Sequence, residues 1–230
     1  MAALQDPEFG AITLRRSKLA RTVRLKLDAR GVISISLPMR TPLFIAKQLL
    51  NDSRQNLRHL VADLRQKRQE FKEGDMVGKS HVLRFETSQT GSYQHRIEQN
   101  QLIISRPLRT ESSELQAIIH TGISKALRLQ AKAYLPRRLQ QLAETYGFAY
   151  QKIRFGSAGT RWGSCSSQGT ISLNIWLMQL PFELIDYVLI HELCHTKEMN
   201  HSQAFWRLIE TYCPNYRQQR KALKQFQPSL

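Results

Sequence analysis

The 230-residue sequence has no long apolar run, few cysteines and far fewer acidic than basic residues. Its apolar runs fall well short of the roughly 18 residues that a membrane-spanning helix needs, so we expect no membrane segment. The stretch Met1–Glu8 has neither a basic segment nor an apolar one behind it, which argues against a secretory signal. Cys165, Cys194 and Cys213 are too few, and odd in number, for a disulfide framework. These absences predict a cytoplasmic protein.

The basic excess is spread along the chain rather than gathered in a tail. Lys and Arg number 34 against 18 Asp and Glu, which gives a net charge of +16. Residues 1–105 hold 18 basic and 10 acidic residues, and residues 106–230 hold 16 and 8. A charge of this size raises nucleic acid as a partner. Solvated basic faces on an ordinary enzyme are the simpler interpretation, and the sequence leaves both open.

The first part of the chain has the patterns of a small mixed α/β, strand-rich domain, which we place at residues 1–107. Apolar and polar residues alternate in 22–27 and 32–37, with turn residues between them, and this predicts a β-hairpin. Leucines at helical spacing predict a helix over 43–71. Three further short strands are predicted at 81–85, 93–97 and 101–105. The chain has no internal sequence repeat and no low-complexity tract.

The second part, residues 108–230, begins with a long helical pattern over 112–146 that Pro136 could kink or break. Residues 152–155 and 170–176 then read as two strands, which we expect to pair. A helix that carries the most informative motif of the chain follows, and a second helix comes after it. A long helix, a small hairpin and a motif-bearing helix together outline a minimal zincin domain.

That motif is HExxH, within the segment HELCHTKEMNH at residues 191–201. Helical positions four apart share one face with Cβ atoms roughly 6 Å apart, so His191 and His195 can direct two imidazoles at one ion. Glu192 lies beside that face, where a carboxylate can act as a base on metal-bound water. Cys194 points away from the face and is expected in the core.

A third ligand requires the chain to leave the helix and return. Asn200 tolerates the left-handed conformation that ends helices, so His201 can swing back toward the ion. The spacing resembles that of metzincins, but Glu198 stands where that group has a glycine. The side chain of Glu198 or Glu210 could orient one of the ligands. The other four histidines have no ligand-like neighbours and are predicted at the surface or at a barrel edge rather than at a metal: His59, His81, His95 and His120.

Further motifs flank these histidines. They are RWGSCS at 161–166, ISLN at 171–174, LP at 180–181 and SQAFW at 202–206. Together with HELCHTKEMNH they resemble the YgjP-like zinc metallopeptidase family, which is related to SprT-like and WLM proteins among the minimal zincins. The resemblance is dense over 153–210 and looser in the N-terminal half. It implies an α+β fold whose C-terminal domain is zincin-like.

The resemblance also implies a zinc-dependent hydrolase in which His191, His195 and His201 bind Zn²⁺ and Glu192 is the catalytic base. Three neutral ligands leave a fourth position for water, whose pKa the ion lowers from 15.7 toward about 7. Glu192 would take the proton and pass it to the leaving amine of a peptide or protein substrate, as in a metalloendopeptidase. Arg161 could stabilise the oxyanion or anchor substrate, or only pack its loop. Asn174 could bind substrate backbone or serve a structural turn.

Other functions stay open at this point. A nucleoside-triphosphate (UTP) pyrophosphatase activity has been attached to part of the family, although imidazoles are unlike the carboxylates that hold Mg²⁺ in nucleotide enzymes. A protease that acts on nucleic-acid-bound proteins, or a nucleic-acid-binding protein, is a further alternative that the net charge suggests. A purely structural zinc site is the weakest alternative, because such sites usually have four ligands and are rich in cysteine.

Overall fold

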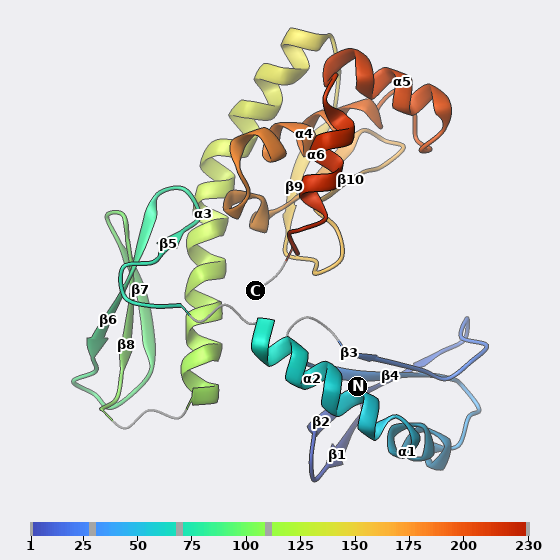
Figure 1. Ribbon diagram of the computed structural model, residues 1–230, viewed down its shortest axis with the longest axis vertical. Coiled ribbons are helices and arrows are strands. Elements are labelled where there is room, and N and C mark those ends of the chain that lie inside the picture. Colours follow the sequence, from blue (N-terminus) through green and yellow to red (C-terminus); the bar gives the residue numbers. More distant parts are fainter. Residues whose placement is uncertain (1, 28–30, 68–70, 109–111, 229–230) are drawn as a thin grey trace. The chain divides into compact units, whose positions relative to one another are not determined.

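The computed structural model describes residues 2–27, 31–67, 71–108 and 112–228 (Figure 1). The fold is α+β, with three sheets and six α-helices among these described residues. The chain divides into two compact units, residues 1–70 and residues 71–229, which we describe one at a time. No helix in the described ranges is both long enough and apolar enough to cross a bilayer.

The first unit contains a four-stranded sheet. Its strands are β1 (Ala2–Asp6), β2 (Gly10–Ser17), β3 (Arg24–Leu27) and β4 (Ile33–Pro38). The order is β1-β2-β4-β3, in which β2 and β4 are parallel and the two outer pairs are antiparallel. The predicted hairpin is confirmed, since Leu25 of β3 faces Ile35 of β4; its turn residues 28–30 lie outside the described residues. β1 and β2 add two strands to those that the sequence predicts.

Two helices pack on one face of this sheet. They are α1 (Leu43–Asp52) and α2 (Arg54–Lys67), in place of the single helix predicted over 43–71. The break falls at Ser53, directly after Asn51 and Asp52, and short polar side chains of this kind compete for backbone hydrogen bonds and weaken a helix. Strand and helix residues share one buried apolar cluster: Ile12, Leu14, Ile33, Ile35, Leu37, Ala46, Leu50 and Leu57.

The second unit begins with another four-stranded sheet. Its strands are β5 (Met76–Val77), β6 (His81–Thr87), β7 (Gln94–Glu98) and β8 (Gln101–Arg106). The three strands predicted between residues 81 and 105 are therefore confirmed. The order β5-β6-β8-β7 repeats that of the first sheet, and so do the pairings, which are antiparallel, parallel and antiparallel.

One long helix, α3 (Ser112–Tyr146), packs against this sheet and continues unbroken through Pro136. The two elements approach closely at Gly122, where a Cβ atom would lie 3.0 Å from Leu102 and 3.1 Å from Ile104. The domain boundary proposed between residues 107 and 108 falls inside this unit, because the apolar face of the sheet is buried against α3.

His81 is buried, with 7% of its surface exposed, so the prediction of a surface position is wrong. Gln130 of α3 donates hydrogen bonds from Nε2 to Nδ1 of His81 and to the carbonyl of Val77, both at 2.8 Å. The amide oxygen of Gln130 accepts from the backbone N–H of Lys79 at 2.6 Å. Burial lowers the pKa of His81, which keeps the ring neutral as an acceptor. This polar contact joins the sheet to α3.

The rest of the second unit surrounds the motif-bearing helix. Three short strands, β9 (Lys152–Gly156), β10 (Gly163–Cys165) and β11 (Thr170–Asn174), form a sheet in the order β10-β11-β9. The predicted pairing of the first and last of these is confirmed and is parallel, whereas β10 and β11 form the hairpin. A short 3₁₀ helix and three α-helices follow: η1 (Ile175–Gln179), α4 (Phe182–Cys194), α5 (Gln203–Tyr212) and α6 (Tyr216–Leu223).

Candidate metal centre

Helix α4 carries HExxH through the interior of the second unit. Pro181 precedes its first residue, and Glu183 lies in its first turn, where a negative charge favours the helix N-terminus. Nine of its 13 residues are buried, among them Cys194 at 0% exposure, as predicted. The helix ends at Cys194, so His191 lies in its last turn and His195 is the C-cap residue.

The three predicted ligand histidines lie together. Nε2 of His191 is 3.2 Å from Nε2 of His195 and 3.1 Å from Nε2 of His201, and the potential ligand atoms of all three lie within 4.8 Å of one another. Nitrogens bound to one tetrahedral zinc ion at 2.0–2.1 Å would be about 3.3 Å apart. The donor set and spacing therefore fit a zinc ion held by three imidazoles, with a fourth position left for another ligand.

The ring of His195 is held by the backbone that follows it. Its Nδ1 donates to the carbonyl oxygen of Glu198 at 3.0 Å. Because a carbonyl only accepts, the proton of the neutral ring is on Nδ1, and the lone pair of Nε2 faces the other two histidines. The main chain of Glu198 therefore orients the candidate ligand His195.

The turn that returns His201 differs from the one predicted. Asn200 does not have a positive φ; among the described non-glycine residues, Gln99 alone does. The chain instead leaves α4 through tight turns, and Thr196 Oγ1 donates to the carbonyl of Leu193 at 2.7 Å. Ser202 then caps α5 by accepting from the N–H of Phe205, and α5 is the second helix expected after the motif.

Two aromatic residues of α5 support the histidine rings. Phe205 is fully buried and stacks on His195 with ring centres 4.4 Å apart. Trp206 stacks on His201 at 5.5 Å, with the ring planes 26° apart. Sequence reasoning assigned neither residue to the site, although both belong to the SQAFW motif that follows the third histidine. Their packing fixes the ring planes of two of the three candidate ligands.

Burial sets the protonation of the central groups. Burial, together with the charges of His195 and His201, lowers the pKa of His191 to about 3. A neutral imidazole is the form that binds a metal. Burial also raises the pKa of Glu192 to about 8, against the opposing effect of the positive Arg161. Glu192 is only 4% exposed, and its Oε2 has no hydrogen-bond partner among the described residues.

Gly163, the first residue of β10, makes room for Glu192. A Cβ atom at this position would lie 2.6 Å from Oε1 of Glu192 and 2.8 Å from its Cδ, distances that real Cβ atoms do not show. The backbone of β10 thus packs directly on the candidate base. Sequence reasoning did not single out Gly163; the signal available was its place in the RWGSCS motif.

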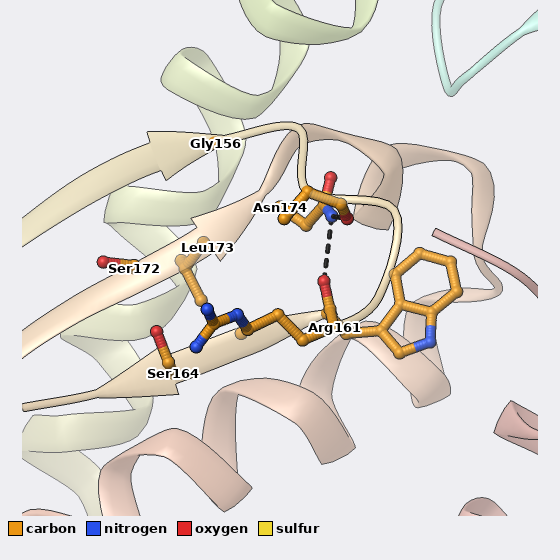
Figure 2. Close-up of a pocket in the computed structure, with 9 residues that line it drawn as sticks. Gly156, Arg161, Ser164, Ser172, Leu173 and Asn174 are labelled. Carbon is orange, nitrogen blue, oxygen red and sulfur yellow. Dashed lines mark hydrogen bonds between the residues drawn. The ribbon is translucent and has the colours of Figure 1, made fainter. Parts of the chain in front are cut away.

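A cavity of about 220 Å³ lies over the small sheet beside Gly163. Figure 2 shows the side chain of Arg161 extended along it toward Ser164 and Leu173. Asn174 is buried, and its Nδ2 donates to the carbonyls of Ala158 and Arg161 at 2.6 and 2.9 Å. Its Oδ1 accepts from the N–H of Trp176 at 3.1 Å.

The hydrogen bonds of Asn174 bear on the two roles left open for it. Both amide hydrogens and the amide oxygen are engaged within the chain. Asn174 therefore holds the backbone of the loop that presents Arg161, which agrees with the structural role left open for it.

An α+β fold with three clustered histidines and an adjacent buried glutamate defines a candidate metallohydrolase. A family model described as YgjP-like, metallopeptidase domain, matches residues 21–226. Because the match spans most of the sequence, the chain belongs to the YgjP-like metallopeptidase family. The family implies a metal ion in the site and peptides or proteins as substrates.

Two solved structures resemble part of the chain. One is the metallopeptidase zymogen abylysin of Pyrococcus abyssi, at 26% identity and a TM-score of 0.36, over 40% of this chain and 93% of that chain. The other is the metallopeptidase zymogen jannalysin of Methanocaldococcus jannaschii, at 20% identity and a TM-score of 0.35, over 39% of this chain and 93% of that one. No curated protein matches the sequence.

Proposed function

We propose that the protein is a zinc-dependent metalloendopeptidase with a zincin-like C-terminal part, in which His191, His195 and His201 bind the metal and Glu192 is the catalytic base. The observation that carries this proposal is the convergence of three imidazoles at the end of α4, where Nε2 of His191 lies 3.2 Å from Nε2 of His195 and 3.1 Å from Nε2 of His201. Membership of a metallopeptidase family supports it independently.

The residues around the histidines suit the hydrolysis of a peptide bond. A zinc ion in this site would supply Lewis acidity, which polarises the substrate carbonyl and lowers the pKa of water toward about 7. Glu192 accepts a proton from the attacking water and delivers it to the nitrogen of the leaving amine as the C–N bond breaks. Its burial supports this role, because a raised pKa brings its proton affinity close to that needed near neutral pH.

Arg161 supplies positive charge on the substrate side of Glu192. Its side chain lines the cavity beside Gly163, and its charge acts on the Glu192 carboxylate. We assign Arg161 to stabilising the oxyanion of the tetrahedral intermediate or to anchoring the substrate carbonyl. Asn174 contributes indirectly, by holding the backbone of the loop from which Arg161 extends.

The direct test combines metal analysis with a cleavage screen. Wild-type protein should hold about one zinc per chain and cleave members of a peptide library, and chelation should remove both properties. Glu192→Gln should keep the zinc and lose cleavage. If this variant cleaved peptides at the wild-type rate, the proposed base would be refuted. Release of pyrophosphate from UTP that survives His191→Ala would instead support the pyrophosphatase alternative.

The outer face of the first sheet supports a second candidate function, nucleic-acid binding. Side chains alternate along each strand, so the face opposite the buried cluster carries two rows of polar residues: Thr13, Ser34 and Lys26, then Arg15, Ser36 and Arg24. The three cations are exposed and form no ion pair with the described residues. Hydroxyls between unpaired cations suit a phosphate backbone. Affinity for duplex DNA or RNA that falls steeply with salt would support this candidate.

A further inference from the structure

A second cavity, of about 310 Å³, lies on α6. Its lining consists of Tyr216 and four exposed basic residues: Arg217, Arg220, Lys221 and Lys224. The four cations are spaced three and four residues apart, so they share one side of the helix, where like charges repel. None of them forms an ion pair with a carboxylate of the described residues. A cavity lined in this way is suited to an anion.

Stacked side chains join this cavity to the metal centre. The guanidinium of Arg220 lies 4.6 Å from the ring centre of Trp206, and Trp206 in turn stacks on the candidate ligand His201. Tyr216 also stacks on Trp206, at 5.6 Å and 18°. A guanidinium stacked on a ring keeps its N–H groups at its edge, where they can donate to a carboxylate. The single ring of Trp206 therefore lies between Arg220 and the candidate zinc ligand His201.

The stacking places the basic cavity next to the metal centre, because Trp206 contacts both Arg220 and the candidate ligand His201. A peptide bound for cleavage at the histidines would pass beside this basic cavity.

We propose that the α6 cavity is a substrate subsite that binds a carboxylate of the peptide near the scissile bond. This inference rests on the proposed peptidase function and names its substrate class, acidic peptides. The carboxylate can come from an Asp or Glu side chain or from the peptide C-terminus. Arg220 makes the bidentate contact, and Lys221 and Lys224 contribute charge.

The test compares peptides that differ only in carboxylates. Zinc-loaded protein is given three peptides. The first has Asp and Glu side chains and an amidated C-terminus, and the second has Asn and Gln in their place and the same amidated C-terminus. The third has the Asn and Gln side chains and a free C-terminal carboxylate. Wild type should prefer one carboxylate-bearing peptide at least tenfold in kcat/KM, and Arg220→Gln with Lys221→Gln should remove most of that preference, mainly through KM. The matched control is Lys132→Gln with Arg137→Gln on α3, which removes equal charge from exposed positions and should leave the preference unchanged.

The results of this experiment distinguish a failure of the subsite from a failure of the proposed peptidase function. Equal cleavage of all three peptides, or an equal loss of preference in the α3 control, would overturn the subsite while the peptidase stands. If no peptide is cleaved, the binding of fluorescent peptides to the Glu192→Gln protein still tests whether the α6 cavity binds a carboxylate. Acidic binding that depends on Arg220 supports the subsite, and binding of the isostere with equal affinity overturns it. Displacement of the acidic peptide by UTP at far lower concentration would also overturn it, in favour of a phosphate ligand.

Discussion

The two units contain four-stranded sheets of the same strand order and pairing, and the outer faces of these sheets differ in their ion pairs. In the second sheet Arg96 pairs with Glu86 and Glu98, and Arg84 pairs with Glu73 at 3.1 Å. On the corresponding face of the first sheet the arginines and the lysine have no such partners among the described residues. One topology thus carries a neutralised face in one unit and a cationic face in the other.

The two units carry equal net charges but distribute them differently. Residues 1–70 hold 14 basic and 6 acidic residues, and residues 71–230 hold 20 and 12, so each unit carries +8. The first unit concentrates this charge in fewer than half as many residues and contributes none of the candidate metal ligands. The second unit contains the candidate metal centre. We infer a division of labour, with chemistry in one unit and electrostatic attraction in the other.

The largest expected effect is a loss of peptide hydrolysis on substitution of the candidate base, Glu192, and it tests whether the two units act separately. Glu192→Gln should reduce peptide hydrolysis about 10³-fold, because a general base contributes on the order of 10²–10⁴ to such reactions. Zinc content, measured by metal analysis, and affinity for nucleic acid, measured at fixed salt, should stay at the wild-type values. Loss of nucleic-acid affinity in this variant would show that the two units do not act separately.

A smaller effect is expected from the backbone that packs on the same carboxylate. Gly163→Ala would place a methyl group within 2.6 Å of Oε1 of Glu192, which must then move. A displacement of about 1 Å costs roughly 10²-fold in rate, so kcat should fall by this order while zinc stays bound. Gly159→Ala is the control, because nothing lies within 4 Å of a Cβ atom there. Equal activity of Gly163→Ala and wild type would show that Glu192 tolerates the shift.

Local periodicity explains what the sequence could predict. The spacing of His191 and His195 depends only on the turn of a helix, so it can be read without knowledge of the fold. The hairpin of the first unit was likewise predictable from alternation and turn residues, and the strands between residues 81 and 105 from short runs rich in strand-forming residues. The cap at Ser202 is also a local feature.

Contacts between distant residues explain what the sequence could not predict. Gly163 matters because β10 packs on α4, and the burial of His81 depends on Gln130, 49 residues away. The apolar pattern of a strand shows which of its faces is buried, but not which strand lies beside it. The repeated strand order of the two sheets therefore cannot be read from the sequence. The turn before His201 uses Thr196 rather than a left-handed Asn200, since more than one turn can return a chain over this distance.

The next largest effect is expected on nucleic-acid affinity, from substitutions on the cationic outer face of the first sheet. Replacing Arg15, Arg24 and Lys26 with Gln should lower affinity for duplex DNA or RNA about tenfold or more and reduce the salt slope by roughly 2–3, because about 0.9 counterions are released per phosphate neutralised. Fluorescence anisotropy over a salt series measures both. Arg84→Gln with Arg96→Gln, on the neutralised sheet, is the control and should leave the slope unchanged. A slope reduced equally by both variants would remove the distinction between the faces.

The smallest expected effect is on stability in acid, and it belongs to the first unit. Hydrogen bonds from Arg58 and Arg54 lower the pKa of Glu8 to about 2 from its ordinary 4.5. Burial raises the pKa of Asp6, but hydrogen bonds from Arg54 at 2.7 Å and from backbone N–H groups outweigh it, so the net shift is downward. Carboxylates with depressed pKa values stabilise the folded state above their unfolded pKa values and lose that contribution as protons bind below.

The first unit should therefore lose stability as the pH falls from about 4.5 toward 2, while stability above this range stays nearly constant. Asp6→Asn with Glu8→Gln should be less stable than wild type at neutral pH and should show a flatter acid dependence. Hydrogen exchange of amides in β1 and β2, compared with β6 and β8 as internal controls, measures this in the full chain. Acid-induced opening of both sheets at the same pH, with equal slopes in wild type and variant, would contradict a role for these ion pairs. In that case the arginines of α2 would not distinguish the first sheet from the second.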